Sequence, residues 1–186
     1  TEHHHNTSRA MLNIFNTIVH CGVKPEYSPV LQRNIVLVNY LSSIMMCLAL
    51  ALASIYFVRS GTTYVSYSIL AAAGLFPIVL ALNQLKFINS SRIFLCLLIP
   101  IEVLVISVYT KMNTDASVDT TNFFDGRFFI IGSALLPLLV IEIREWKLLC
   151  FGLSASVLSL AFFDVVHNTF GVGLADFGLD ERNYYF

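Results

Sequence analysis

The chain has 186 residues, of which 56% are hydrophobic and only 12% are charged. A soluble domain of this length needs more polar surface than this composition provides, so the sequence excludes an ordinary soluble globule and indicates a core shared with lipid. The formal net charge is -1 and there is no basic patch, so we expect membrane lipid as a partner and no nucleic acid.

The first 34 residues precede every long apolar run and divide into two segments. Residues 1–9 form a polar tail, whose three histidines are more typical of a disordered terminus or a tag remnant than of a metal site. Residues 10–34 predict a cytoplasmic juxtamembrane segment. It begins with an amphipathic helix that is too short to span a membrane and suits the interface. Gly22 then predicts a helix stop, and Ser28 with Pro29 predicts a new helix start.

The first long apolar run, residues 35–58, sets the plan for the rest of the chain. It holds 24 residues without a charge, and a helix of that length, at about 1.5 Å per residue, crosses a hydrocarbon core of roughly 30 Å. Four further apolar runs, separated by short polar joints, repeat this plan. We therefore predict an all-α integral membrane fold. It is a helical bundle with five visible transmembrane spans, at residues 35–58, 64–85, 93–109, 128–143 and 147–163 within a bundle of residues 35–163.

The Lys and Arg residues near the span ends predict the orientation. With the N-terminus in the cytoplasm, seven basic residues lie inside and four lie outside, which favours this arrangement. The inside set is Arg9, Lys24, Arg33, Lys86, Arg92, Arg144 and Lys147, and the outside set is Arg59, Lys111, Arg127 and Arg182. Residues 164–186 then form an acidic extracytoplasmic segment that ends in aromatic residues, typical of the entry to another span. We expect six spans in the complete protein.

Residues 19–39, VHCGVKPEYSPVLQRNIVLVN, resemble the opening of a bacterial six-helix membrane module. In that family a short juxtamembrane helix ends in a V-H-x-G-[VL]-K-P-like turn, which is followed by a basic, Asn-containing entry to the first span. Such modules precede the cytoplasmic domains of sensor histidine kinases and of class III adenylate and guanylate cyclases. The resemblance implies a sensory or regulatory role in the bacterial inner membrane, and it carries no site residues over to this chain.

Five residues are candidates for a ligand site. Glu102 is the one acid deep inside a predicted span, where a carboxylate usually faces a cavity, a partner or water because hydrocarbon disfavours it. It is either a ligand-binding or proton-sensing group or a protonated acid bonded to a neighbouring helix. Asn39 and Asn83 are candidates as well, although hydrogen bonding between helices is the stronger interpretation. Asp164 and His167 suit a cation or pH-responsive site, with a solvated acidic rim as the stronger alternative.

Pro77, Pro100 and Pro137 lie near the middles of the second, third and fourth predicted spans, and each is expected to bend its helix. Bent helices can leave a cavity between them. The sequence holds no strict metal motif and no cofactor or catalytic arrangement, so we expect no metal, no cofactor and no catalytic activity from these residues. The four cysteines predict reduced thiols that pack as small hydrophobes.

The expected function is a membrane-embedded sensor or regulatory module of a bacterial signalling protein. We expect a homodimer that passes a small-molecule or lipid ligand, or a membrane state, to a cytoplasmic cyclase or histidine kinase effector in the same chain. Two alternatives stay open. A small transporter or channel would use Glu102 and the three prolines as a midplane site. A structural subunit of a larger membrane complex would explain a short chain without evident chemistry.

Overall fold

The fold is a bundle of helices, seen in a computed structural model that describes residues 13, 15–60, 64–113 and 121–179. Every regular element in these ranges is helical, which confirms the predicted all-α class. The predicted polar tail of residues 1–9, with Arg9, and the end of the acidic segment, with Arg182, lie outside the described residues.

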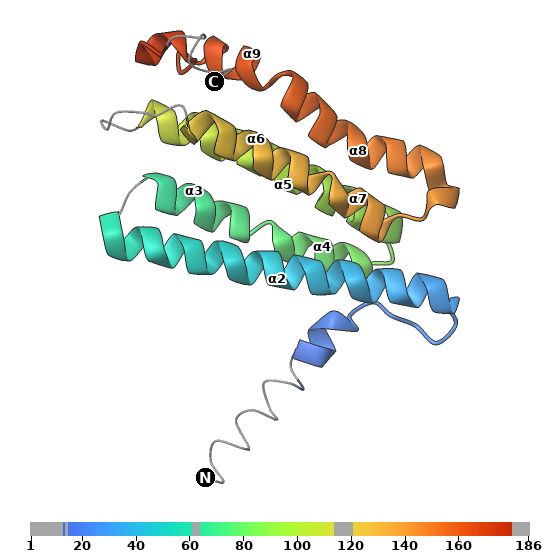
Figure 1. The fold of residues 1–186 in the computed structure, drawn as a ribbon. Coiled ribbons are helices and arrows are strands. Elements are labelled where there is room, and N and C mark those ends of the chain that lie inside the picture. Colours follow the sequence, from blue (N-terminus) through green and yellow to red (C-terminus); the bar gives the residue numbers. More distant parts are fainter. Residues whose placement is uncertain (1–12, 14, 61–63, 114–120, 180–186) are drawn as a thin grey trace.

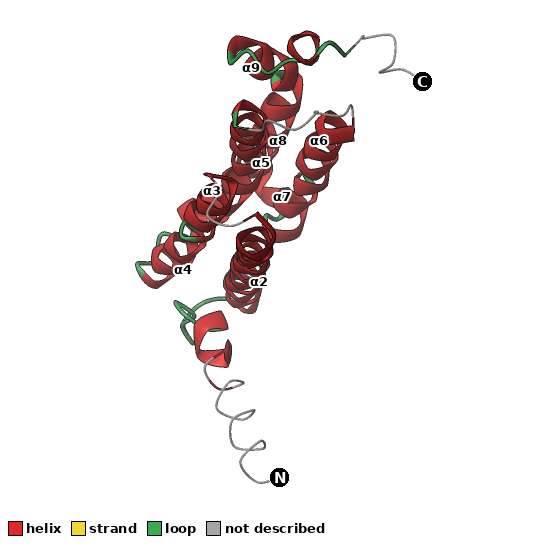
Figure 2. Ribbon diagram, turned by 90° about the vertical axis from the view of Figure 1, so that its left-hand side faces the viewer, coloured by secondary structure: helices red, strands yellow, loops and turns green. Residues whose placement is uncertain are grey.

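The long helix α2 and the two shorter helices α3 and α4, which run back along it, form the first layer of the bundle (Figure 1). α5 lies at the centre of the bundle. α5 contacts each of the other α-helices from α2 to α9, while α2 packs along α3 and α4. Figure 2 shows the same helices nearly end-on, with α2 on one side and α8 and α9 on the other. The elements are α2 (Pro29–Ser60), α3 (Tyr64–Ala73), α4 (Phe76–Gln84), α5 (Ile88–Met112), α6 (Thr121–Ser133), α7 (Leu135–Val140), η1 (Ile143–Glu145), α8 (Trp146–Ala161), α9 (Phe163–Thr169) and η2 (Ala175–Phe177).

Within the described residues, three helical segments are long and apolar enough to cross a membrane: Pro29–Arg59, Val65–Gln84 and Ile88–Met112. A fourth is present if the pair Phe124–Val140 and Ile143–Ala161, bent by 113°, counts as one span. The predicted count of five spans is therefore not confirmed, although the first three predicted spans coincide with these segments. Only 28% of the most apolar stretch of Pro29–Arg59 is buried within the chain, so most of its apolar side chains face outward, where lipid would cover them.

Two helix breaks lie where prolines remove backbone hydrogen bonds. Proline has no N–H to donate to the carbonyl four residues earlier. That carbonyl belongs to Ala73 for Pro77 and to Ser133 for Pro137, and α3 and α6 end at these two residues. The predicted bends are confirmed there as full interruptions. Pro100, in contrast, lies inside α5, which continues through it.

The segment before α2 also follows its sequence signals. Residues 15–19 are helical, and Gly22 ends the turn after them with a φ of +80°. α2 begins at Pro29, and the N–H of Leu31 donates to Ser28 Oγ at 3.3 Å, as an N-cap requires. The predicted helix stop and helix start are both confirmed.

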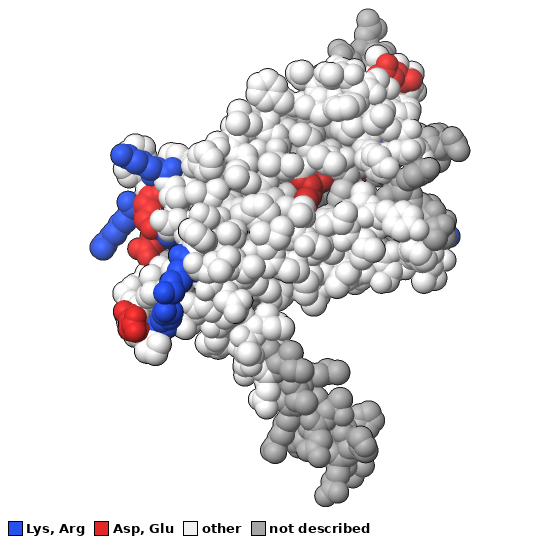
Figure 3. All heavy atoms as spheres, turned by 180° about the vertical axis from the view of Figure 1, so that it is seen from behind, with Lys and Arg blue, Asp and Glu red and all other residues white. Residues whose placement is uncertain are grey.

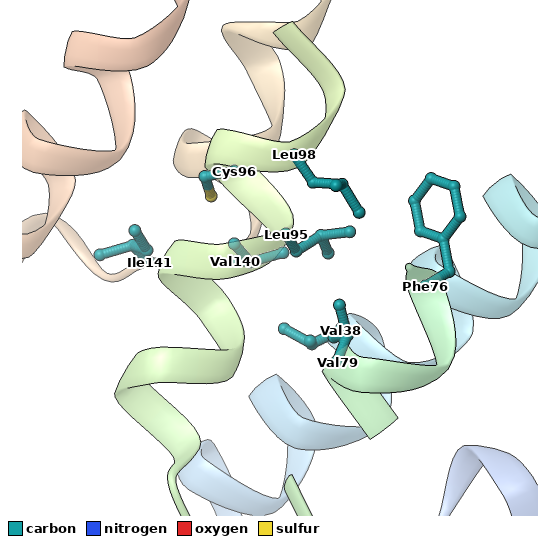
Figure 4. Close-up of a cluster of buried hydrophobic side chains, with 8 residues drawn as sticks. All are labelled: Val38, Phe76, Val79, Leu95, Cys96, Leu98, Val140 and Ile141. Atoms are coloured by element: carbon teal, nitrogen blue, oxygen red, sulfur yellow. The ribbon is translucent and has the colours of Figure 1, made fainter. Parts of the chain in front are cut away.

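The main hydrophobic core lies near the end of the bundle where α4 meets α5 and α7 meets α8. Figure 4 shows side chains from α2, α4, α5 and α7 meeting there. A smaller core, made by Ile130 and Phe163, joins α6 to α9. All four cysteines are free thiols, as predicted. The buried members of the main core are Val38, Phe76, Val79, Leu95, Cys96, Leu98, Val140 and Ile141.

Candidate functional site

The side chains of Asn39 and Asn83 meet inside the bundle, although 44 residues separate them in the sequence. Asn83 Nδ2 donates to Asn39 Oδ1 at 2.7 Å, and neither side chain is exposed. Asn39 Nδ2 in turn donates to the backbone carbonyls of Val19 at 3.0 Å and Cys21 at 2.8 Å. The side-chain oxygen of Asn83, Oδ1, is buried and has no hydrogen-bond partner among the described residues. These bonds tie the segment before α2 to both α2 and α4.

We refer to residues 19–27 as the docked turn. It approaches α4 closely at Gly22, where a Cβ atom would lie 2.4 Å from the backbone oxygen of Asn83. Only glycine therefore allows the turn to pack this closely. From α2, Gln32 Nε2 donates to the carbonyls of Lys24 at 3.1 Å and Tyr27 at 2.9 Å. The docked turn, part of the segment for which the sequence predicts a resemblance to signalling modules, is thus held by two helices.

An ion pair with one buried partner lies at the same end of the bundle. Arg92, only 2% exposed, donates from Nη1 and Nη2 to the two carboxylate oxygens of Glu145, at 2.5 and 3.0 Å. Its Nη2 also donates to Asn89 Oδ1 at 2.5 Å. Asn34 Nδ2 donates to Glu142 Oε1 at 3.3 Å, which links the start of α2 to the same joint between α7 and α8. Bidentate pairing of this kind fixes orientation as well as distance.

Charged residues gather at the ends of the bundle. Figure 3 shows Lys and Arg side chains, with acidic ones among them, collected at one end. This is the end where α2 begins, where α4 meets α5 and where α7 meets α8. The fold therefore keeps the two predicted sets of basic residues apart. The described inside set is Lys24, Arg33, Lys86, Arg92, Arg144 and Lys147, and the described outside set, at the other helix ends, is Arg59, Lys111 and Arg127.

A second polar cluster lies at the opposite end and includes His167, which is fully buried. His167 Nδ1 lies 2.7 Å from the carbonyl of Phe163, and its Nε2 lies 3.2 Å from Lys111 Nζ and 3.1 Å from Ser107 Oγ. A carbonyl only accepts and an ammonium only donates, so Nδ1 carries the hydrogen and His167 is neutral. Burial lowers the pKa of His167, and the nearby Lys111 lowers it further.

Asp164 has different surroundings although it lies on the same short helix. It is exposed and pairs with Arg127, whose guanidinium lies 5.2 Å from the centre of the Phe163 ring. The interpretation of these two residues as a solvated acidic rim is therefore wrong for His167, which is buried, whereas Asp164 is exposed. Among the described residues, no three His, Cys, Asp or Glu side chains come together as a metal site would require.

Glu102 stands apart from the other candidates, on the central helix α5. It is partly buried, and its Oε1 is buried without a hydrogen-bond partner among the described residues. From the rise of a helix, it lies about 15 Å along α5 from Arg92 and about 14 Å from Lys111. The structure thus brings Asn39 and Asn83 together and leaves Glu102 by itself. A groove of 310 Å³ lies elsewhere, between α2 and α3, and none of the three prolines lines it.

Sequence reasoning missed three features of these sites. Lys111 belongs to the predicted outside set of basic residues near span ends, yet its side chain is buried at 5% exposure. Its spacing of four residues from Ser107 is the signal that could have placed both on one helix face. Nothing local indicates the pairing of Arg92 with Glu145, 53 residues apart. The close approach of Gly22 to α4 is likewise a long-range feature.

No protein-family model, no curated protein and no solved structure matches this chain. The resemblance of residues 19–39 to signalling modules therefore stays a prediction.

Proposed function

We propose that the chain is the membrane-embedded sensor or regulatory module of a bacterial signalling protein. In this proposal the five predicted spans, with a sixth to follow, cross the inner membrane with the N-terminus in the cytoplasm. The module is a homodimer, and its effector is a cytoplasmic adenylate or guanylate cyclase or histidine kinase domain in the same chain. The stimulus is a small molecule, a lipid or a state of the membrane.

The observation that carries the proposal is the docked turn. Asn39 of α2 holds the carbonyls of Val19 and Cys21, and Gly22 packs against the backbone of Asn83 on α4. Any displacement of α2 relative to α4 must therefore move the docked turn or break its hydrogen bonds. This gives the juxtamembrane segment a defined mechanical link to the bundle, which is what a regulatory module needs.

The proposed mechanism is a shift between two arrangements of the helices. A ligand or membrane state that favours one arrangement raises its population in proportion to the difference in affinity. The interruptions before Pro77 and Pro137 supply places where α3 and α4, or α6 and α7, can change their relative angle. The polar contacts at the basic end then pass this change to the cytoplasmic side.

The test begins with the native full-length protein, purified from its own membranes. We expect an intact mass above 20.8 kDa, together with nucleotide cyclase or autokinase activity. Asn39→Ala should change that activity severalfold, because it removes both bonds to the docked turn. Ser54→Ala, which removes only a hydrogen bond to Leu50 within the exposed part of α2, is the matched control and should leave it unchanged. A protein without either activity, or one that copurifies with unlike chains in fixed ratio, would overturn the proposal.

Glu102 supports a second candidate, a small transporter or channel. Its buried Oε1 without a partner, two residues after Pro100 on the central helix, is the kind of acid that midplane sites use. Proteoliposomes that hold the protein and a pH-sensitive dye would show proton-coupled flux, which Glu102→Gln should abolish. The first proposal expects no flux in this assay, so the two functions are separable.

A further inference from the structure

α4 ends in a motif whose key position normally holds glycine. The N–H of Phe87 donates to the carbonyl of Leu82 at 2.9 Å, and the N–H of Lys86 donates to that of Asn83 at 3.1 Å. These two bonds define a Schellman motif, in which the residue at the position of Lys86 is left-handed. Lys86 indeed has a φ of +69°. This backbone conformation is strained for a residue with a Cβ atom and unstrained for glycine. A lysine therefore stands where the backbone favours glycine.

The docked turn brings a second lysine to this position. Gly22 packs on the backbone of Asn83, and Lys24 follows two residues later, fixed by the bond from Gln32 to its carbonyl. A side-chain hydrogen bond with Lys24 lowers the pKa of Lys86, and the repulsion between the two like charges lowers it further. Two cationic side chains are thus held together by the fold.

Acidic side chains lie among the basic ones at this end (Figure 3), but no ion pair between described residues joins one of them to Lys24 or Lys86. The ion pairs among the described residues join Arg92 to Glu145 and Arg127 to Asp164, and neither involves Lys24 or Lys86. α5 begins two residues after Lys86 without a side-chain cap, which adds the positive end of a helix dipole nearby. The two lysines and this helix end can together attract an anion from outside the chain.

The residues beside Lys86 indicate which kind of anion. Leu85 is 65% exposed and Phe87 is 58% exposed, so one lysine lies between two large exposed apolar side chains. The corner belongs to the basic end of a bundle whose long helices can cross a membrane. A phospholipid fits this chemistry, because its phosphate can pair with lysines while its acyl chains cover apolar side chains.

We propose that Lys24 and Lys86 form a binding site for the phosphate of an anionic phospholipid, with Leu85 and Phe87 against its acyl chains. The site does not depend on the signalling role proposed above. It would operate equally in a transporter or a structural subunit.

The test is native mass spectrometry of the full chain in detergent, titrated with phosphatidylglycerol or with zwitterionic phosphatidylcholine. We expect preferential retention of phosphatidylglycerol. Lys86→Gly is the decisive variant, because it removes a charge and also relieves the backbone strain. It should bind phosphatidylglycerol about fivefold more weakly while its melting temperature stays equal or rises. Lys24→Gln should weaken binding by a similar factor, and Lys86→Arg should retain it.

Arg144→Gln is the matched control, since Arg144 is an exposed cation at the same end of the bundle. Its binding should stay within about twofold of the unaltered protein. Lys86→Asn, which also tolerates the left-handed conformation, replaces Lys86→Gly if that variant does not fold. Equal losses in Arg144→Gln and Lys86→Gly would show diffuse attraction to a basic surface and overturn the site. Unchanged binding in both lysine variants would do the same.

A soluble competitor distinguishes a lipid from a free phosphate compound. Glycerol 3-phosphate offers the same phosphate chemistry without acyl chains. If it binds to the full chain as tightly as phosphatidylglycerol does, the apolar contacts contribute nothing and the lipid assignment is overturned. We expect it to compete only weakly.

Discussion

Gly22→Ala tests the docking of the juxtamembrane turn more directly than any other single substitution. The new Cβ would lie 2.4 Å from the carbonyl oxygen and 2.6 Å from the carbonyl carbon of Asn83, and both atoms belong to the backbone of α4. To reach even 3.0 Å from that oxygen, the turn must withdraw by about 0.6 Å. If the turn withdraws without α2, the bonds from Asn39 to Val19 and Cys21, now 3.0 and 2.8 Å long, are distorted as well.

The expected cost follows from these contacts. A side chain in the left-handed region costs about 1–2 kcal/mol, and each weakened neutral hydrogen bond about 1 kcal/mol. Docking of the turn should therefore lose about 3–4 kcal/mol. The measurable loss of stability cannot exceed the free energy of docking itself. Once the substitution costs more than that, the turn detaches and the bundle remains folded.

Thiol labelling with a maleimide, followed by peptide mass spectrometry, measures detachment at Cys21, which is half-buried beside Gly22. The labelling rate of Cys21 should rise at least tenfold in Gly22→Ala, while that of the buried Cys96 should not change. Gly171→Ala is the matched control: its φ is +66°, but a Cβ there meets no atom within 4 Å. The control isolates the backbone strain. Equal labelling of Cys21 in the two variants would refute the close approach of the turn to α4.

Two further predictions concern the ends of the bundle. Glu145→Ala should destabilise the protein by about 2–4 kcal/mol in thermal or chemical unfolding. This is less than the roughly 3–5 kcal/mol for breaking a fully buried pair, because Glu145 is 38% exposed. Replacing Arg92 and Glu145 together by leucine should recover most of the lost stability, and failure to recover it would contradict the idea that the unpaired charge of Arg92 causes the loss. Stability should also fall as pH drops below about 6.5, the unfolded pKa of histidine. The lowered pKa of His167 means that the unfolded chain binds more protons there, although Lys111, Arg127 and Asp164 also face this region. His167→Gln should flatten the slope of unfolding free energy between pH 7 and 5, and an unchanged slope would assign it to other groups.

The positions of helices and their ends could be predicted because they depend on local chemistry. Long uncharged runs specify the spanning segments, and a serine before a proline specifies the start of α2. The two interruptions follow from proline, since α3 and α6 end at the carbonyls that Pro77 and Pro137 leave without a donor. The division of the basic residues between the two ends follows from the order of the apolar runs and the polar joints.

The faces of the helices could not be predicted in the same way. A helix that is apolar all round has no polar stripe to show which side meets a neighbour. The contacts of Asn39 with Asn83, of Arg92 with Glu145 and of Lys111 with His167 join residues 44, 53 and 56 positions apart. The burial of His167 was misjudged for the same reason, because acidic residues near it in the sequence indicate solvent whereas its face of α9 packs on α5.

These polar contacts matter more to a helical membrane protein than to a soluble one. Lipid tails are as apolar as leucine, so apolar contacts between helices are not favoured over contacts with lipid by the hydrophobic effect. Packing and interhelical hydrogen bonds must then decide which faces meet. On α5 the described bonds of this kind lie toward the two ends, at Ser91 and Arg92 on one side and at Lys111 on the other, while Glu102 lies between them and its buried Oε1 has no partner among the described residues. Any ligand that pairs with Glu102 would therefore act on the part of α5 that the described polar contacts of this helix do not fix.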